Sequence, residues 1–507
     1  MQSKSKLIAF NDLERMIIKP GFCTVCGACE AACPIHAIEI EHETPQRLHD
    51  CSEHIDACPI CYDICPHSDA LIYEALKFVV EAPERRENLG YYSEILLAQA
   101  ANPSIRAATK SGGVVNALLN FAINEKIIDS AITSETSPTT SLKVKPSISL
   151  VPDDMLSAVD SKIMPSAVAQ AYGRAVFEHG KTHIAFVGIP CHVLALRKLE
   201  AWQHKIMDNL EIIIGLFCLW GFSLSTLLEF LLDEYRISAN EIQSVDLSAD
   251  AYIVNMENRQ IRVPLSKVKS HILNRCKTCV DFTSEYADIS IGGASPLKEW
   301  SIVIIRTKKG EEFFNKALSS GIIITKDVES EPQTLAHLIQ LAAYKRKSAL
   351  HEMKTMRERG IEVPGAAELF VRPSKIGLLE GVDVEQIMTK NVITLPSTLT
   401  VSQFFQKIAE HHHTGFPVID ETGKVIGVIT LQDAMKIAEE KRNNVSIGEI
   451  CTKRLIIIYP DKSVAEALEK MEKHEVGRLL VFNKTEHKLV GILTRSDIMH
   501  LIKIIYG

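Results

Sequence analysis

The chain has 507 residues, too many for one hydrophobic core, and this length predicts about three or four domains. Its net charge of −7 and pI near 6.2 argue against general nucleic-acid binding. The apolar run to consider for a membrane, residues 212–228, contains glycines and serines, so we expect a buried strand, a loop and the start of a helix there. We therefore expect a soluble, cytoplasmic protein with no transmembrane segment and no signal peptide.

Two cysteine runs come first along the chain. The first is spaced C-x2-C-x2-C-x3-C before a proline and comprises Cys23, Cys26, Cys29 and Cys33. The second ends in C-x2-C-x3-C before a proline and comprises Cys51, Cys58, Cys61 and Cys65. Zinc prefers two separated C-x2-C pairs and disulfides need an oxidising compartment, whereas four thiolates in so tight a run suit one cubane iron–sulfur cluster. Residues 1–85 therefore predict a ferredoxin-like domain with a 4Fe-4S cluster for each run.

The two runs are expected to exchange their last cysteines, because in two-cluster ferredoxins the fourth cysteine of each run binds the other cluster. By that rule Cys65 joins the first three cysteines of the first run, and Cys33 joins those of the second. Cys51 is the least secure ligand, since six residues separate it from Cys58 where the usual spacing is two. Without Cys51 that cluster would be a three-iron species.

The elements expected next alternate between strands and helices. Residues 68–82 predict a helix that closes the first domain. Between about 86 and 345, apolar strands precede amphipathic helices, for example 183–190 before 191–202 and 210–218 before 225–235. Residues 335–360 predict a long charged helix, and 346–380 a helical linker. The fold class is therefore multidomain, α+β and α/β.

A third set of cysteines is scattered through the central domain. Cys191 and Cys218 follow predicted strands, and Cys276 and Cys279 form a C-x2-C pair. Ligands of an open α/β sheet gather beyond the carboxyl ends of its strands, so these four thiols could converge on a third cluster. Free cysteines are also often small buried hydrophobic residues, and the spacing leaves both interpretations open.

The central segments resemble one family. Over about residues 90–345, the chain resembles the beta subunit of coenzyme F-420-reducing hydrogenase and its dehydrogenase relatives. The short sequence motifs that carry this resemblance are residues 110–119, 187–191, 215–218, 276–281, 287–290, 299–301 and 306–307. The N-terminal extension is similar to the input subunit of a dehydrogenase of reduced coenzyme F-420 and to the front half of F-420-dependent sulfite reductase. The resemblance implies FAD, a 4Fe-4S cluster on the third quartet, and a coenzyme F-420 (deazaflavin) site.

Cofactor-contacting residues follow from the resemblance. A turn before a predicted helix would hold the flavin pyrophosphate, or would be an ordinary helix cap; it comprises Lys110, Ser111, Gly112 and Gly113. Gly188 and Pro190 would shape a tight turn that lets backbone approach the cofactor, or a plain turn. A segment expected just after a strand would contact the cofactor or merely end the strand; its candidates are Asp288, Ser290 and Gly292.

Residues 381–507 contain an internal repeat. Residues 384–389 recur as 447–452, and 427–430 recur as 491–494. The segment resembles a tandem pair of CBS domains, which implies adenosine nucleotide binding (AMP or ATP) between the repeats, or a module used only to dimerise. The nucleotide candidates are Thr394, Thr430, Asp433, Thr494 and Asp497. We expect a homo-oligomer formed through this pair.

The expected function is that of an iron–sulfur flavoprotein oxidoreductase. A hydride carrier gives two electrons and a cubane cluster takes one, so a flavin must stand between them. The expected reaction passes electrons between reduced coenzyme F-420 and a redox partner protein or ferredoxin, with no catalytic acid or base. Alternatives are a beta subunit of the NAD(P)H- or formate-dehydrogenase type, although no G-x-G-x-x-G word occurs, and a non-catalytic electron-wiring or regulatory subunit.

Overall fold

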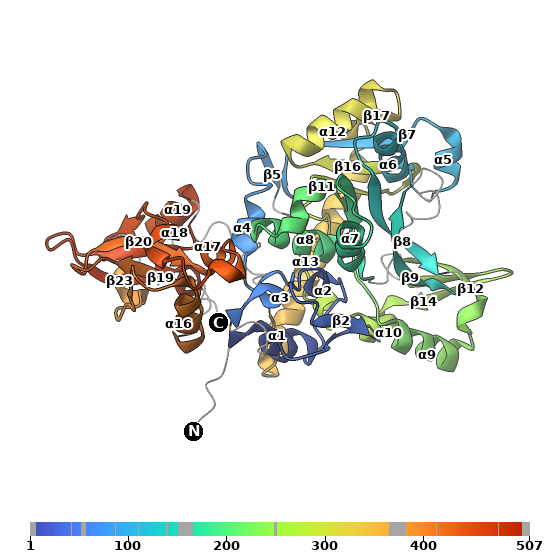
Figure 1. Ribbon diagram of the computed structural model, residues 1–507. Helices are drawn as coiled ribbons and strands as arrows, with labels where there is room; N and C mark the ends of the chain where they lie inside the picture. Colours follow the sequence, from blue (N-terminus) through green and yellow to red (C-terminus); the bar gives the residue numbers. More distant parts are fainter. Residues whose placement is uncertain are drawn as a thin grey trace. The chain divides into compact units, whose positions relative to one another are not determined.

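The computed structural model describes residues 7–41, 43–51, 57–86, 88–109, 111–137, 140–150, 166–247, 251–364, 382–411, 413–474 and 476–498 (Figure 1). The chain divides into two compact units. The larger lies within residues 9–51 and 59–370, and the smaller within 1–8, 52–58 and 371–507. Among the helices of these described ranges, none combines the length and apolar character needed to cross a membrane.

The cysteine runs of the larger unit lie among short elements. These are α1 (Ala9–Leu13), the π-helix η1 (Glu14–Ile18), α2 (Ala28–Ala31), the hairpin of β2 (Ile38–Glu41) and β3 (Thr44–Arg47), α3 (Ile60–Asp63) and α4 (Ile72–Leu76). The helix predicted over 68–82 is only partly present, because the chain is helical at α4 and continues in turns over 77–82. Those turns bury Val79, so the apolar residues of this segment reach the core without a long helix.

An eight-stranded mixed sheet forms the centre of the larger unit. Its strand order is β17 (Ile323–Asp327), β7 (Glu94–Ala100), β16 (Leu297–Ile305), β15 (Ile289–Ala294), β11 (Leu210–Leu216), β10 (Ile184–Gly188), β8 (Ser130–Ser137) and β9 (Thr140–Ser149). Strands β15, β11, β10 and β8 pair in parallel, and the remaining pairings are antiparallel. The carboxyl ends of β10, β11, β15 and β7 therefore lie at one edge of the sheet.

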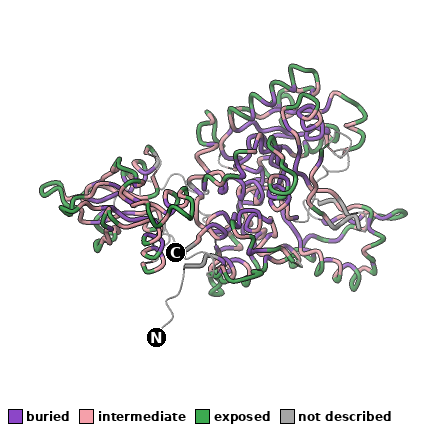
Figure 2. The backbone as a smooth tube through the Cα atoms, viewed as in Figure 1, coloured by how far each residue is buried: buried purple, intermediate pink, exposed green. Residues whose placement is uncertain are grey.

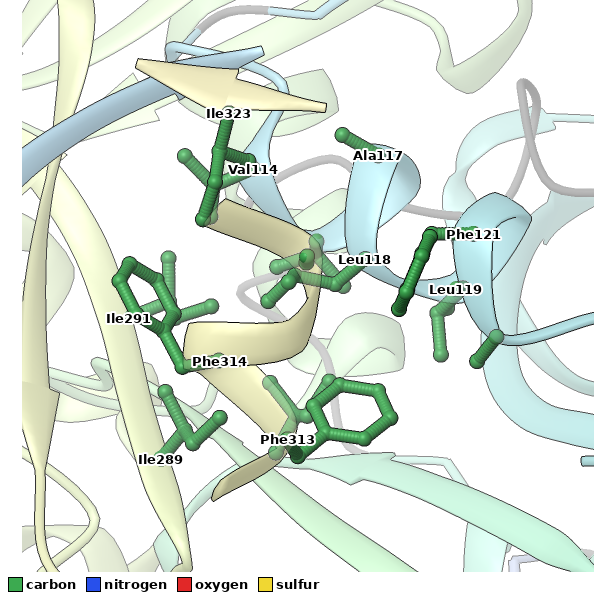
Figure 3. Close-up of a cluster of buried hydrophobic side chains, with 14 of the residues drawn as sticks. Val114, Ala117, Leu118, Leu119, Phe121, Ile289, Ile291, Phe313, Phe314 and Ile323 are labelled. Carbon is green, nitrogen blue, oxygen red and sulfur yellow. The ribbon is translucent and has the colours of Figure 1, made fainter. Parts of the chain in front are cut away.

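Helices cover both faces of this sheet, because successive strand residues point to opposite faces. Helices α6 (Val114–Asn124) and α12 (Lys308–Ser319) bury one face; Figure 3 shows that core, including Val114, Leu118, Phe313, Phe314, Ile289 and Ile291. On the other face, Tyr172 of α7 (Val168–Phe177) meets Phe186 of β10. Leu338 of α13 (Pro332–Glu358) packs there with β7 and β16. Figure 2 shows the buried backbone concentrated along these layers. The α/β prediction for this segment is confirmed.

A second core lies under the antiparallel sheet β12 (Ile242–Leu247), β13 (Ala251–Met256) and β14 (Gln260–Pro264). Helix α9 (Leu224–Tyr235) and α10 (Leu265–Val268) pack on it through Leu227, Tyr252 and Val263. Strand β11, a loop and α9 confirm the prediction for residues 212–228, and α13 confirms the long helix. The other elements of this unit are β5 (Glu84–Arg86), β6 (Gly90–Tyr92), α5 (Pro103–Ala107), α8 (Pro190–Ala201), α11 (Asn274–Lys277) and 3-10 turns at Lys205–Asn209, Ala239–Glu241, Lys269–His271 and Val328–Ser330.

The smaller unit contains the two sequence repeats. The first comprises α15 (Val384–Ile387), β18 (Leu395–Pro396), α16 (Val401–His411), β19 (Gly415–Ile419), β20 (Val425–Thr430) and α17 (Leu431–Met435), followed by a 3-10 turn at Glu439–Lys441. The second comprises α18 (Ile447–Ile450), β21 (Ile457–Ile458), α19 (Val464–Lys473), β22 (Arg478–Phe482) and β23 (Leu489–Thr494). Strands β1 (Leu7–Ile8) and β4 (Ala57–Cys58) also pair in this unit.

Each repeat packs its entry segment on the last strand of the other repeat. Thr389 bridges Ile492, and Val428 bridges Thr452. A Cβ on Gly427 would lie 2.5 Å from Sγ of Cys451, so the glycine makes room for that thiol. The thirteenth cysteine is therefore buried between the two repeats.

Candidate cysteine and cofactor sites

Four thiols line one hollow in the larger unit. Its wall includes Cys23, Cys26 and Cys29 of the first run together with Cys65 of the second, and the apolar side chains of Leu13, Ile17 and Ile18. Thr24, His67 and Pro66 complete this side of it. A cubane cluster needs four thiolates in an apolar pocket, so the donor set of this hollow fits a 4Fe-4S cluster.

The local backbone explains how a short loop presents these thiols. Gly27 has φ of 85° and precedes α2, which places Cys29 one turn away from Cys26. A side chain at Gly27 would be strained and would also meet Gln170 of α7 at 2.7 Å. The amide of Val25 donates to Sγ of Cys23 at 3.4 Å, as amides do to sulfur ligands of clusters.

The protonation of these thiols is coupled. Burial, with a smaller contribution from the nearby Cys65, raises the pKa of Cys23 to about 12, and the Val25 amide opposes the rise. Burial also raises the pKa of Cys26 and of Cys29, and neighbouring cysteines add to both shifts. Buried thiolates so close together repel one another, so a cationic group bound among them would be needed for all four to ionise.

The second run is placed only in part. Cys61 is buried in α3, and Cys33 is buried beside Cys51. Burial is the main cause that raises the pKa of Cys51, and the charge of Cys33 adds to it. The amide of Ala37 donates to Sγ of Cys33 at 3.2 Å. Cys58 belongs to the smaller unit, so it is described there and not with the other three.

The third quartet gathers from three segments of the larger unit. Cys191 is the second residue of α8, Cys218 follows β11, and α11 carries Cys276 just before Cys279. Burial raises the pKa of Cys276 to about 12, with further contributions from Cys218 and Cys279. Burial raises the pKa of Cys191 well above its usual value, with contributions from Cys276, Cys26 and Cys218. The same four-thiol donor chemistry therefore recurs here, next to the first run.

Thr24 and His67 connect the two sites. Burial raises the pKa of Cys191, and the hydroxyl of Thr24, on the wall of the first hollow, partly offsets that rise. Thr24 Oγ1 also shares a hydrogen bond of 2.7 Å with Nε2 of His67, and both side chains are buried. The first hollow and the third quartet are thus neighbours that share polar side chains.

The glycine turn before α6 lies at the carboxyl edge of β7. Gly112 and Gly113 have φ of 43° and 69°, and the amide of Ala100 donates to the carbonyl of Gly112 at 2.7 Å. A Cβ on Gly112 would lie 2.8 Å from Oγ of Ser301, while the amide of Gly113 donates to the Ser111 carbonyl. No side chain caps α6 at Gly113, so the helix start can receive an anion, and its backbone fits a flavin pyrophosphate. Lys110 lies outside the described residues.

Two glycines at the same edge of the sheet allow neighbouring side chains to pack closely against the backbone. Gly188 ends β10 opposite Gly215 of β11, and Pro190 is the first residue of α8. A Cβ on Gly188 would lie 2.7 Å from both Phe186 and His192. A Cβ on Gly292 would overlap the ring of Phe217 at 1.9 Å, so this glycine seats the aromatic ring that precedes Cys218.

Asp288 does not lie where the sequence predicted. Asp288 precedes β15 instead of following a strand. It therefore lies at the edge formed by the amino ends of the parallel strands, whereas Gly188 and Cys218 lie at the other edge, formed by their carboxyl ends. Its Oδ1 accepts from Arg197 and from Oγ1 of Thr307, each at 2.7 Å. Its Oδ2 accepts from the Ile213 amide at 2.8 Å. These bonds give Asp288 a structural role at the start of β15, so the predicted alternative in which it ends a strand is wrong.

Ser290 has a similar structural environment inside β15. Its hydroxyl accepts from Nε of Arg306 at 2.6 Å and donates to the carbonyl of Ser284 at 3.0 Å. Both partners are buried, so the hydroxyl supports a side-chain network within the protein.

The two CBS-like repeats contain matching Thr–Asp pairs. Oγ1 of Thr430 donates to Oδ2 of Asp433 at 2.7 Å, and the Asp433 amide donates back at 3.3 Å. Thr494 and Asp497 form the same pair with the same two distances. Thr394 lies just before β18 and is partly exposed. Each Asp therefore keeps Oδ2 on its own threonine at the start of a helical turn.

Comparison with known families assigns the central domain. Residues 95–172 match the N-terminal part of the coenzyme F-420 hydrogenase/dehydrogenase beta subunit, and residues 181–331 match its C-terminal part. This segment of the chain belongs to the family of F-420 hydrogenase/dehydrogenase beta subunits. Residues 16–39 match the 4Fe-4S binding domain, and 384–440 and 447–504 match the CBS domain. The predicted family and its order of domains are confirmed.

Relatives from this family match along almost their whole length. The coenzyme F-420 hydrogenase subunit beta of Methanothermobacter thermautotrophicus is 26% identical, covering 54% of this chain and 99% of that protein. One F(420)H(2) dehydrogenase subunit of Methanosarcina mazei is 26% identical, covering 68% and 96%. A polypeptide of the F-420-reducing [NiFe] hydrogenase complex from Methanosarcina barkeri has a TM-score of 0.51 at 26% identity, covering 55% and 99%.

Two buried lysines near the cysteines escaped the sequence analysis. Nζ of Lys198 in α8 donates to the carbonyl of Cys65 at 2.6 Å and to that of Ser68 at 2.9 Å. Nζ of Lys345 in α13 donates to the carbonyls of Cys218 and Asp281, each at 2.5 Å. Neither lysine belongs to a spacing motif, and Lys345 lies beyond the segment that matches the family. Lysines in helical patterns are usually expected in solvent, so no signal in the sequence marked them.

Proposed function

We propose that the protein is an iron–sulfur flavoprotein oxidoreductase that passes electrons between reduced coenzyme F-420 and a one-electron acceptor. FAD and three 4Fe-4S clusters are the proposed cofactors, with a ferredoxin or another redox protein as partner. The observation that carries the proposal is that α8 carries Cys191 and also bonds Cys65 of the first hollow through Lys198, because this makes the third quartet and the first hollow adjacent sites. Adjacent one-electron sites are what a protein that carries electrons along its length requires.

The residues of the central domain serve the proposed flavin by shaping its site. When bound, a flavin would exchange a hydride with the deazaflavin and single electrons with clusters. The backbone of Gly112 and Gly113 and the start of α6 would bind its pyrophosphate. Gly188 and Gly292 leave room at the adjoining sheet edge for His192 and Phe217 to pack closely, and Phe217 directly precedes Cys218.

The proposed cluster sites form a series. The third quartet adjoins the sheet edge, the first hollow adjoins the third quartet, and the remaining site would use Cys51, Cys58, Cys61 and Cys33. The thiols would contribute the ligands, and in the first and third sites they are buried or half-buried. An external acceptor would then dock at the ferredoxin-like part, which holds the last site of the series.

The CBS pair is proposed to bind an adenosine nucleotide and to join two copies of the protein. Support comes from the matching Thr430–Asp433 and Thr494–Asp497 pairs, which leave one carboxylate oxygen of each Asp outside the cap bond. Thr394 is the additional residue proposed to contact the nucleotide. If the pair serves dimerisation alone, AMP and ATP will not bind.

Anaerobic reconstitution with iron, sulfide and FAD tests the function. We expect about 12 iron atoms per chain, which is three cubanes, together with a flavin absorption that bleaches on addition of reduced coenzyme F-420. Bleaching by NADH alone would instead support the nicotinamide-linked alternative. A preparation with clusters and no flavin would support an electron-wiring subunit. The Cys451→Ser variant is the matched control, because its thiol lies between the CBS repeats.

A further inference from the structure

A buried lysine lies against the third cysteine quartet. Lys345 is 2% exposed, and its Nζ bonds the carbonyls of Cys218 and Asp281. Helix α13 is held in place next to it by Arg346, which forms an ion pair of 2.9 Å with Glu285. The ammonium group is therefore fixed by two hydrogen bonds and by the helix that carries it.

The ammonium group of Lys345 joins two of the segments that carry the quartet. One of its acceptors is the carbonyl of Cys218 itself. The other is the carbonyl of Asp281, two residues after Cys279. The lysine is thus a buried cation fixed between the segments of Cys218 and Cys279.

A fixed cation changes the energy of a reduced cluster more than that of an oxidised one. Reduction adds one negative charge to the cluster, and Coulomb attraction in a buried site is weakly screened. Net charge and hydrogen bonds near the sulfur ligands are known levers on cluster potentials. A lysine fixed beside two ligand segments acts through the net charge, because its hydrogen bonds go to the carbonyls of Cys218 and Asp281 and not to sulfur atoms.

We propose that Lys345 is a positioning residue whose fixed positive charge raises the reduction potential of the 4Fe-4S cluster held by Cys191, Cys218, Cys276 and Cys279, a role that rests on the function proposed above. The higher potential favours electron entry at this site from the hydride-accepting side. Lys198 holds the matching position at Cys65 in the first hollow, and it touches no member of the third quartet among its described hydrogen bonds.

A potentiometric titration of the full-length holoprotein, followed by electron paramagnetic resonance, tests the proposal. The wave that disappears in Cys279→Ser identifies the third cluster. In Lys345→Gln, which keeps a donor and removes the charge, we expect that wave to move to more negative potential. We expect at least about a tenfold change in its reduction equilibrium, or about 59 mV for one electron. Lys345→Arg keeps the charge and should move it less, and Lys198→Gln should leave the third wave in place.

The possible outcomes distinguish a failure of the proposed role of Lys345 from a failure of the proposed third cluster. An unmoved third wave in Lys345→Gln, with iron and sulfide at wild-type levels, overturns the role of Lys345 and leaves the proposed function standing. Loss of the third cluster in Lys345→Gln and Lys345→Met, with retention in Lys345→Arg, also overturns it, because the lysine would then serve assembly. A wild-type protein with no wave sensitive to Cys279→Ser overturns the proposed third cluster.

Discussion

Cys65 lies with Cys26 in one hollow, although the two belong to different cysteine runs. The segment that carries Cys65 is held there by Lys198, whose Nζ donates to Cys65 and to both the carbonyl and the hydroxyl of Ser68. The first hollow is therefore completed by a residue that the chain supplies after an intervening hairpin and helix.

Double substitutions will show which cysteines share a site. We expect Cys23→Ser and Cys65→Ser each to remove the iron and sulfide of one cluster, and the double variant to lose no more than either single one, because both thiols line one hollow. Cys23→Ser combined with Cys33→Ser should lose two clusters. Iron and acid-labile sulfide per chain are the measurements. An additive loss for Cys23 and Cys65 would contradict the shared hollow.

Asp288 is expected to stabilise the fold and not to hold a cofactor. Asp288→Ala removes one of the two carboxylates that pair with the buried guanidinium of Arg197, the other being Glu200, and leaves the Ile213 amide without its acceptor, which costs about 1–3 kcal/mol of unfolding free energy. Lys354→Ala, which breaks an exposed ion pair with Glu358, should change it by less than about 0.5 kcal/mol. Urea unfolding is the measurement. Wild-type stability accompanied by loss of flavin would instead indicate a cofactor contact.

The same carboxylate predicts a pH dependence. Burial alone would raise the pKa of Asp288, but Arg197, Thr307 and the Ile213 amide together hold it below its usual value of 3.8. A depressed pKa stabilises the folded state above the unfolded pKa, and this stabilisation is lost as the pH falls through the folded value. The stability gap between wild type and Asp288→Asn should therefore be constant from pH 7 to about 5 and should shrink below pH 4. A gap that grows on acidification would refute this account.

Adjacent glycines offer a matched pair at the sheet edge. In Gly292→Ala the new Cβ would overlap the Phe217 ring, so we expect a loss of about 1–3 kcal/mol and a reduced iron content from the displaced segment before Cys218. In Gly293→Ala the Cβ meets no atom within 4 Å, and both quantities should be unchanged. Equal behaviour of the two variants would show that Phe217 is free to move.

The Thr–Asp pairs of the CBS repeats have a structural and a proposed binding role. Thr430→Val removes the cap at the start of α17 and should cost about 0.5–2 kcal/mol in thermal unfolding of the chain. Asp433→Asn should weaken AMP or ATP binding measured by calorimetry, while Asp420→Asn, in an exposed turn of the same repeat, should not. Unchanged nucleotide binding in Asp433→Asn would show that Asp433 serves only to cap α17.

Local pattern was sufficient for the features that depend on neighbours in sequence. The strand and helix within 210–235 and the long helix predicted over 335–360 followed from periodicity, and the repeat within 381–507 followed from recurring segments, because each pattern can be read from neighbours in sequence. The helix over 68–82 was overestimated, since its apolar residues are buried by turns that the pattern could not distinguish from a helix.

By itself the sequence determined the families, the order of the domains and the identities of the thiol donors. Only the tertiary structure decided that Cys65 faces Cys26, that Asp288 lies at the opposite sheet edge from Cys218, and that Lys345 is buried beside Cys218. The reason is that these relationships join segments far apart in the chain. The packing of helices on the sheet decides which buried position places a charge beside a given thiol. Local sequence propensities do not predict that packing.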